Sequence, residues 1–274
     1  MGYINVNSDK CTKCNTCIAS CPVACISSDS ASKLPVVKTE KEALCVYCGH
    51  CESICPEGAL VHSLSQQALQ SAKEQSKLVN AADLALYFKQ RRSIRNFKKE
   101  VVDKQLLEQA FDVVRFAPTG HNRQKNQWIV VYNTKVVEAI AAATIDWMRG
   151  VVKANPEIGT RYGFPGLVIA FDRGRNLISR NAPHLIICYT PASHPVGPKD
   201  AVIATTQMDL YLPSLGVGTC WAGFIYMALQ QSDELKKIVG LDENSAVHAA
   251  LLTGYPKYNY HKIPHRKAAD VRWI

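Results

Sequence analysis

At 274 residues and 47% hydrophobic composition, the chain is long enough for one ordinary domain and a second, smaller one. No apolar run reaches the roughly 18 residues of a membrane-spanning helix, and residues 1–10 are polar, so we expect a cytoplasmic protein with no membrane segment or signal peptide. The net charge of +9 arises after residue 62, where the basic residues are scattered, so we expect no nucleic-acid partner.

Two cysteine runs with the same spacing, Cys-x2-Cys-x2-Cys-x3-Cys-Pro, dominate the N-terminal part. They consist of Cys11, Cys14, Cys17, Cys21 and Pro22, and of Cys45, Cys48, Cys51, Cys55 and Pro56. Bacterial ferredoxins with two [4Fe-4S] clusters use this pattern, and the fourth cysteine of each run binds the other cluster. We therefore expect one cluster on Cys11, Cys14, Cys17 and Cys55, and a second on Cys45, Cys48, Cys51 and Cys21.

Zinc and disulfides are the alternative explanations of these cysteines. Paired Cys-x2-Cys knuckles also bind zinc, but the two runs hold more cysteines than one zinc ribbon uses. A disulfide scaffold needs an oxidising compartment, which the polar N-terminus does not support. Cys25 lies outside both runs, and we interpret it as a small buried hydrophobic residue.

Short strands over 3–6 and 59–64 are predicted to flank the runs, which gives a small first domain over 1–62 with two matching halves. The composition then changes to Gln, Ala, Ser, Lys and Glu without Gly or Pro over 65–79. This composition favours a helix. We therefore predict a helical connector over 63–80 between the first domain and a second domain over 81–274.

The second domain is predicted to mix helices and strands. Helices are expected over 83–90, after the N-cap Asp103, and over 134–152, 199–215 and 232–239; strands over 127–132, 183–189 and 246–253; and loops over 117–122 and 155–166. Strands and helices do not alternate regularly, which favours an α+β fold over a doubly wound sheet. Neither a Gly-x-Gly-x-x-Gly turn after a strand nor a Walker sequence is present, so no dinucleotide domain is predicted.

A basic segment follows the first helix of this domain. Arg91, Arg92, Ser93 and Arg95 offer guanidinium and hydroxyl donors on a short stretch of backbone, which suits a phosphate monoester. A solvated helix end is the alternative, because basic residues are favoured at helix C-termini.

Four segments, in their order and spacing, favour the phosphate site over the solvated helix end. They are RRSIRNF at 91–97, APTGHN at 117–122, APHLII at 182–187 and LGVGTCWAGF at 215–224. With them, the chain resembles the FMN-dependent nitroreductase family from about residue 82 to its end. The resemblance implies an α+β fold and a homodimer with FMN at the subunit interface.

The resemblance also assigns the FMN contacts by position in these motifs. It implies that Arg91, Arg92, Ser93 and Arg95 contact the phosphate, the ribityl chain and the N1/O2 edge; that Pro118, Thr119 and Asn122 reach in from the partner subunit; that Cys220, Trp221, Ala222 and Gly223 lie against the isoalloxazine near N5; and that Arg266 and Lys267 complete the phosphate site. The family's Gln-Pro-Trp after the asparagine is replaced by residues 124–128, so Gln124 has no assigned role. For His121, Cys220 and Trp221 we favour packing over direct chemistry, and Cys188 is expected in the core.

No catalytic side chain is expected, because the flavin carries the chemistry. The prediction is therefore an enzyme: an iron–sulfur flavoprotein that passes electrons from two [4Fe-4S] clusters to FMN and on to a small electrophilic acceptor such as a nitroaromatic or a quinone. External ferredoxin or NAD(P)H are the candidate donors. The alternatives are a non-catalytic electron carrier or redox sensor, and a protein that consumes or remodels flavin as its substrate. The expected fold class is α+β, with a small two-cluster ferredoxin-like domain fused to a nitroreductase-fold domain.

Overall fold

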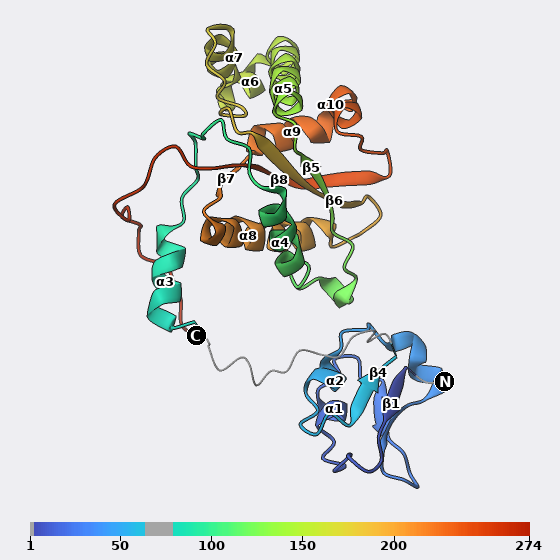
Figure 1. The fold of residues 1–274 in the computed structure, drawn as a ribbon. Coiled ribbons are helices and arrows are strands. Elements are labelled where there is room, and N and C mark those ends of the chain that lie inside the picture. The colour runs from blue at the N-terminus through green and yellow to red at the C-terminus, as the bar shows by residue number, and fades with distance from the viewer. Residues whose placement is uncertain (1–2, 64–78) are drawn as a thin grey trace. The chain divides into compact units, whose positions relative to one another are not determined.

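The computed structural model describes residues 3–63 and 79–274, and it contains two compact units (Figure 1). One comprises Met1–Val79 with Gly120–Arg123, and the other Asn80–Thr119 with Gln124–Ile274. The helix predicted over 65–79 falls almost wholly outside the described residues.

The first unit is built from two antiparallel strand pairs and short helices. Its elements are β1 (Ile4–Val6), α1 (Thr16–Ala19), β2 (Ile26–Ser28), β3 (Pro35–Val37), the 3-10 helix η1 (Thr39–Leu44), α2 (His50–Ser53) and β4 (Leu60–His62). Strand β1 pairs with β4, with Ile4 opposite His62, and β2 pairs with β3. The two strands predicted to flank the cysteine runs are confirmed, whereas β2 and β3 were not predicted.

The two halves of the first unit repeat one local geometry. Helix α1 follows Asn15 and helix α2 follows Gly49, and both residues have left-handed backbone, with φ of 62° and 71°. Asparagine and glycine are the residues that adopt this conformation most easily. Each turn starts a helical turn that buries the third cysteine of its run, Cys17 or Cys51.

The second unit is organised around a four-stranded antiparallel sheet in the order β5-β6-β8-β7. Its strands are β5 (Gln127–Val131), β6 (His184–Pro191), β7 (Gly218–Trp221) and β8 (Ser245–Gly254). Neighbouring side chains of β6 point to opposite faces, so Leu185 and Ile187 join one core cluster and Ile186 joins the other. Because both faces of β6 are covered, its central residues 185–188 are apolar and fully buried. The strands predicted over 127–132, 183–189 and 246–253 are confirmed within two residues at each end.

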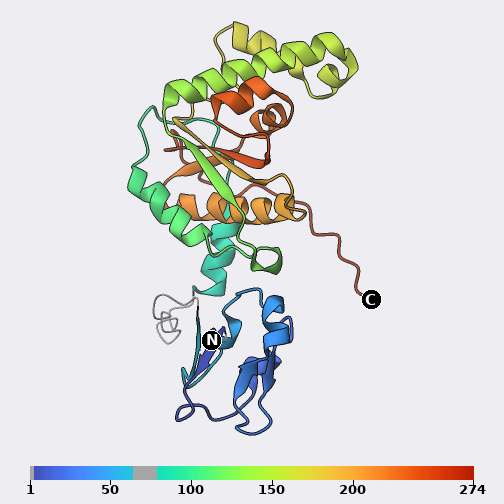
Figure 2. The same cartoon turned by 90° about the vertical axis from the view of Figure 1, so that its right-hand side faces the viewer.

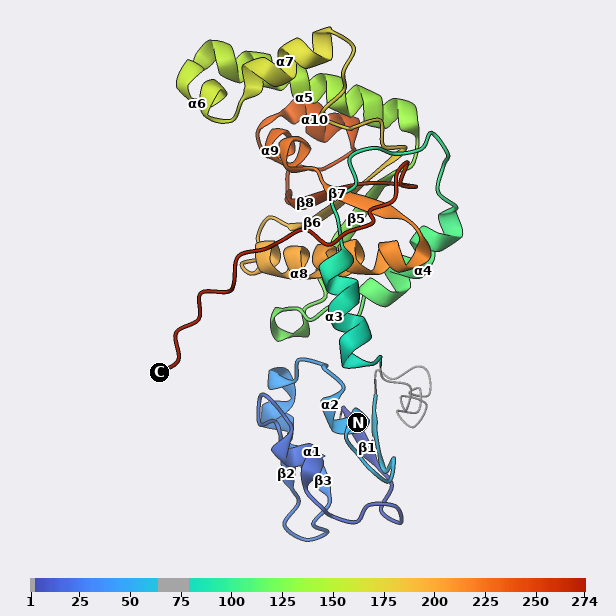
Figure 3. The ribbon, with the colours of Figure 1, turned by 90° about the vertical axis from the view of Figure 1, so that its left-hand side faces the viewer.

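Helices cover both faces of the sheet (Figures 2 and 3). On one side are α5 (Thr134–Ala154), α9 (Gly223–Gln231) and α10 (Asp233–Ile238), with α6 (Pro156–Arg161) and α7 (Phe164–Asp172) packed on α5; on the other are α4 (Lys104–Val114) and α8 (Gly197–Tyr211). Helix α3 (Ala81–Gln90) precedes this body, and a 3-10 turn, η3 (Gly120–Asn122), lies in the loop before β5. Among the described residues, no helix combines the length and apolar character needed to cross a bilayer.

Side-chain caps explain where several helices begin. Asp103 accepts a hydrogen bond from the Gln105 backbone N–H at 2.9 Å, which confirms the predicted N-cap, and Ser232 accepts one from Leu235. The predicted loop over 155–166 is wrong, because α6 and α7 occupy most of it. Asn155 caps α6 through Ile158, and proline is favoured in the first turn that follows.

The region around residues 199–224 also differs from the prediction. Helix α8 ends at Tyr211 and continues as the 3-10 helix η4 (Leu212–Leu215), which contains Pro213. Strand β7 and helix α9 were not predicted. Strand β7 is an edge strand paired only with β8 among the described strands, and its four residues are too few for a periodic signal.

Candidate functional site

The first unit contains two cavities lined by cysteine side chains. Cys11, Cys14, Cys17 and Cys55 line one cavity, and Cys21, Cys45, Cys48 and Cys51 line the other. The fold thus brings the eight cysteines together in the two sets expected, with the fourth cysteine of each run facing the other run's cavity. Pairing of β1 with β4, together with the chain reversal between the halves, produces this exchange.

The donor chemistry of these cavities fits iron–sulfur clusters better than one zinc ion. Among the described residues, no group of three or more His, Cys, Asp or Glu side chains is arranged to hold a metal ion. A cubane places each thiolate on a different iron atom, so its four ligands surround a larger body than one ion. A ring of thiols around an enclosed cavity matches that requirement.

The thiols within each set also influence one another electrostatically. Burial raises the pKa of the Cys17 thiol, and the sulfurs of Cys14 and Cys55 add to the effect. Burial likewise raises the pKa of Cys51 to about 11, with contributions from Cys48 and Cys45. Four close, partly buried thiols are costly to ionise without a metal, and a cluster removes that cost by binding the thiolates directly.

The cavity of Cys21 has two further polar neighbours that lie outside the cysteine pattern. The sulfur of Cys25 lies 3.5 Å from the sulfur of Cys21, and the Nε2 atom of His62 lies 3.8 Å from the sulfur of Cys45. Cys25 is 2% exposed, so its predicted burial is confirmed, but it also lines the cavity. Burial raises the pKa of Cys25 to about 12, and the neighbouring Cys21 reinforces the shift.

In the second unit, backbone hydrogen bonds join the basic segment, residues 91–95, and the residues just after it to β7 and to the residues after β8. The N–H of Ile94 donates to the carbonyl of Thr219 in β7, and the N–H of Lys98 donates to Tyr255 beyond β8. Gly218 permits this approach, because a Cβ there would lie 2.6 Å from the Ile94 side chain. The local fold therefore fixes where Arg91 to Arg95 lie relative to β7.

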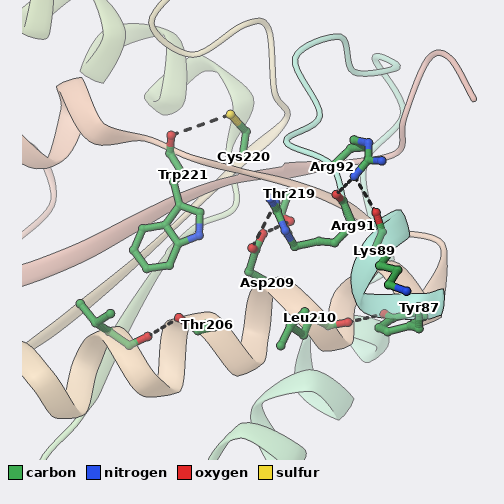
Figure 4. Close-up of polar contacts among 11 residues, drawn as sticks. Tyr87, Lys89, Arg91, Arg92, Thr206, Asp209, Leu210, Thr219, Cys220 and Trp221 are labelled. Atoms are coloured by element: carbon green, nitrogen blue, oxygen red, sulfur yellow. Dashed lines mark hydrogen bonds and ion pairs between the residues drawn. The ribbon is translucent and has the colours of Figure 1, made fainter. Parts of the chain in front are cut away.

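Figure 4 shows the polar contacts of this segment with β7 and α8. A guanidinium nitrogen of Arg91 lies 3.4 Å from a carboxylate oxygen of Asp209, and the hydroxyl of Thr219 donates to the other oxygen of Asp209. Asp209 is 4% exposed, whereas the Arg91 side chain is 31% exposed. The buried carboxylate therefore orients a guanidinium that still reaches solvent.

Arg92 has unused hydrogen-bonding capacity. Its Nη1 atom donates to the carbonyls of Lys89 and Arg91, but its buried Nε has no partner in the described residues. Buried donors without partners are rare in folded proteins. Both arginines line a cleft of about 990 Å³ between the end of α3, β7 and residues 255–263. An orphaned donor in a basic cleft fits an anionic group such as the FMN phosphate.

Arg180 and Asp209, which no sequence pattern indicated, add charges near β7. The buried Cys220 thiol has its pKa raised by burial, an effect that the positive charges of Arg95 and Arg180 oppose. Burial, with Arg95 nearby, lowers the pKa of Arg180. The second missed residue is Asp209, which stands on the buried face of α8 among apolar positions. Arg180 lies two residues before the 182–187 motif and has a left-handed φ of 53°, which is a signal visible only in the structure.

The structure places the other predicted FMN residues in different surroundings. Ser93, like Arg91 and Arg92, is half-buried, and Ala222 is buried at the start of α9, whereas Trp221 and Gly223 are exposed. Trp221 is 38% exposed, whereas Cys220 is 6% exposed.

Within the described chain, neither Thr119 nor the C-terminal Arg266 and Lys267 line the cleft of Arg91 and Arg92. Thr119, whose hydroxyl accepts a hydrogen bond from the Gln124 N–H at 3.0 Å, lines a separate cavity of about 490 Å³ beside α4, β5 and α8. Pro118 is exposed, and Asn122 lies in η3 with a φ of 53°. Arg266 and Lys267 lie in an exposed extended segment, and the cleft lining ends at Ile263.

Two protein-family models match different parts of the chain. A model described as the nitroreductase family matches residues 88–255, and one described as a 4Fe-4S dicluster domain matches residues 10–60. An Archaeoglobus fulgidus protein provisionally named as an NADH dehydrogenase/NAD(P)H nitroreductase is 23% identical over 171 residues, which are 61% of this chain and 82% of that protein.

Solved structures with a similar fold include two nitroreductases with bound FMN. The Bacteroides fragilis protein has 20% identity and a TM-score of 0.58, and the match covers 70% of this chain and 98% of that one. The Desulfitobacterium hafniense protein has 24% identity and a TM-score of 0.55, over 70% of this chain and 96% of that one. At these identities the structural similarity establishes the α+β nitroreductase fold alone. The family match covers more than half of the chain, so this protein belongs to the nitroreductase family of oxidoreductases, and it carries an N-terminal 4Fe-4S dicluster domain.

Proposed function

We propose that this protein is an iron–sulfur flavoprotein oxidoreductase, which passes electrons between two [4Fe-4S] clusters in its first unit and FMN in its second, and reduces a small electrophilic acceptor. The observation that carries the proposal is the presence, in one chain, of two cavities that are each lined by three cysteines of one run and the fourth of the other, and of a basic cleft with an orphaned arginine donor. When bound, the clusters supply one-electron transfer and FMN supplies two-electron transfer to the substrate.

The first unit contributes the cluster ligands. Cys11, Cys14, Cys17 and Cys55 hold one cluster, and Cys45, Cys48, Cys51 and Cys21 the other. Each set includes a cysteine from both runs, so loss of either cluster loosens both halves. The small core of this unit contains Ile26 and Leu60 beside three cysteines, which is little apolar surface for an independent fold.

The second unit contributes the anion site. Arg91, oriented by Asp209, and Arg92, with its free Nε, bind the phosphate; Ser93 and Arg95 extend the site along the same backbone. Arg95 and Arg180 keep the region around Cys220 electropositive, and such fixed positive charge favours negative charge on a bound group. The exposed indole of Trp221 offers an apolar wall beside it.

The active form is proposed to be a homodimer. Helix α8 presents Val202 and Ile203, which are 43% and 41% exposed, and Phe116 after α4 is 73% exposed. Exposed large apolar side chains such as these are typical of a surface that another chain covers. A second copy would also supply Pro118, Thr119 and Asn122 to the flavin, which explains why Thr119 lies away from the arginine cleft within one chain. Sedimentation of FMN-loaded protein tests this, and a monomer that retains full flavin would contradict it.

The decisive experiment combines composition with turnover. Protein purified without oxygen should contain about eight iron atoms per chain if both cavities hold cubanes, together with one FMN. Stopped-flow reduction with NADH, NADPH and reduced ferredoxin in turn then identifies the donor, and we expect reduced ferredoxin to reduce the clusters first. Zinc in place of iron would overturn the cluster assignment. Flavin that is reduced without saturable turnover of any small acceptor would favour an electron carrier or sensor, and loss of the flavin spectrum would favour flavin as the substrate.

A further inference from the structure

The two halves of the first unit differ at one buried position beside the cluster ligands. The fourth residue after Cys21 is Cys25, whereas the fourth residue after Cys55 is Ala59. Both are 2% exposed, so each is enclosed by the unit to the same extent. The two halves therefore have the same pattern of cluster ligands and differ in one buried residue next to them.

The two positions make similar backbone contacts with the neighbouring ligand sulfur, but their side chains make different contacts. The N–H of Ala59 donates to the sulfur of Cys55 at 3.3 Å, and the backbone N–H of Cys25 likewise interacts with the sulfur of Cys21. The methyl group of Ala59 adds no polar contact. The thiol of Cys25 adds one, because its sulfur lies 3.5 Å from that of Cys21, within the range of a hydrogen bond between sulfurs.

Cluster binding decides which sulfur is the donor. A cysteine that ligates iron does so as a thiolate, so Cys21 then carries no proton to donate. Cys25 is not one of the eight pattern cysteines, and its thiol can donate to the Cys21 thiolate. Reduction adds negative charge to a cluster and its ligands, and a hydrogen bond to a ligand sulfur stabilises that charge.

We propose that Cys25 is a positioning residue whose thiol donates an S–H···S hydrogen bond to Cys21 and thereby raises the reduction potential of the cluster that Cys21 binds. This inference rests on the proposed function, since it requires the second cavity to hold a cluster. It gives the two clusters of one repeated framework different potentials, so that an electron entering the unit is directed to the Cys21 cluster.

The test is a redox titration followed by EPR, on anaerobically purified full-length protein. Cys25→Ala removes the donor, and we expect the midpoint of the Cys21 cluster to shift to lower potential while the midpoint of the other cluster stays unchanged. Cys25→Ser keeps a donor, so its midpoint should stay at or above that of the unchanged protein. Cys48→Ser, which replaces a ligand of the same cluster, assigns the signals. Ile26→Val is the packing control, because Ile26 also lines this cavity and is 5% exposed but offers no donor side chain.

Each outcome decides for or against the proposal. An unchanged midpoint in Cys25→Ala, equal shifts in the Ala and Ser variants, or an equal shift in Ile26→Val would overturn it. If iron analysis shows that both Cys25 variants lose the cluster while Ile26→Val keeps it, Cys25 is needed as a ligand or for folding, and the proposal is also overturned. Unchanged protein that holds only one cluster would instead overturn the proposed function, which separates the two failures.

Discussion

The two units of this protein are stabilised in different ways. The core of the second unit consists of two large clusters of aliphatic and aromatic side chains, one on each face of its sheet. The core of the first unit consists of Cys17, Cys25, Ile26, Cys51 and Leu60. Hydrophobic burial can hold the second unit together without a cofactor, whereas we expect the first to need the energy of iron–thiolate bonds.

Removal of iron should produce the largest effect and should separate the two units most clearly. After oxidation and chelation, we expect residues 3–63 to lose their protection from amide hydrogen exchange, because the small core cannot offset the chain entropy. The sheet of the second unit should keep its protection. Exchange measured peptide by peptide checks this, and an unchanged first unit after complete iron loss would show that its core suffices.

A substitution that creates a cavity in the core of the second unit should destabilise that unit and leave the first unit intact. Ile187 on β6 is 0% exposed. Ile187→Ala should lower the free energy of unfolding of this unit by about 2–5 kcal/mol, since lost burial and the remaining cavity both destabilise it. Iron content should not change. Urea denaturation followed by tryptophan fluorescence measures the effect, and Ile169→Ala, at a side chain 52% exposed, is the control with an expected change within about 0.5 kcal/mol.

The basic segment tests whether the second unit binds FMN where proposed. Arg91→Ala should remove a charge-assisted hydrogen bond of about 1.5–3 kcal/mol, and so weaken FMN binding about tenfold or more. Asp209→Asn should have a smaller effect in the same direction, because Arg91 remains but is less well oriented. Fluorescence titration of the flavin-free protein measures both affinities.

Two further variants complete that measurement. Arg115→Ala removes an exposed arginine whose partner is Asp112 on the same helix, and it should not alter affinity. Arg266→Ala tests the C-terminal tail, and we expect weaker FMN binding. If the Arg91 and Arg266 variants both retain FMN fully, the segment after α3 is a solvated helix end and the anion site lies elsewhere.

The smallest effect is a pH dependence confined to the second unit. His184 is buried, its Nε2 accepts from the Val102 N–H at 3.0 Å, and its Nδ1 lies 2.9 Å from the Tyr132 carbonyl. Burial lowers the pKa of His184 from 6.5, although the Tyr132 contact opposes the shift. Because the unfolded chain then binds a proton more readily, stability is fully present above pH 6.5 and falls as the pH drops from there toward the folded-state pKa.

Denaturation of the second unit at several pH values between about 7.5 and 5.5 checks this dependence. His184→Gln should flatten it, and the part that remains should come from His248, whose pKa is also lowered by burial and by His194. An equally steep dependence in the glutamine variant would assign the effect to other groups.

Local sequence signals were enough for much of this protein. The cysteine spacing predicted two ligand sets, and the structure brings those same sulfurs to two cavities. The spacing within each run is a local property, whereas the fourth cysteine of each run reaches the other cavity through the fold of the unit. Apolar runs located β5, β6 and β8, and Asp103 marked the start of α4. The loop predicted over 155–166 is instead largely α6 and α7, since a proline after a capping Asn155 begins a helix instead of breaking one.

Tertiary structure decided which side chains from distant segments meet. Nothing near Asp209 in the sequence indicates that it orients Arg91, and Arg180 approaches Cys220 only because the loop before β6 packs beside β7. The exposure of Trp221 follows from the same cause, whereas Cys25 meets Cys21, only four residues away, through a turn in which the Ala24 N–H donates to the Cys21 carbonyl. The sequence by itself determined the ligand types, the longer strands β5, β6 and β8, and the family, because these depend on spacing and periodicity along the chain. The Arg91–Asp209 charge pair depended on the fold, because it acts over a few ångströms in space between residues that are far apart in sequence. The Cys25–Cys21 contact depended on a backbone turn, which residue spacing alone does not specify.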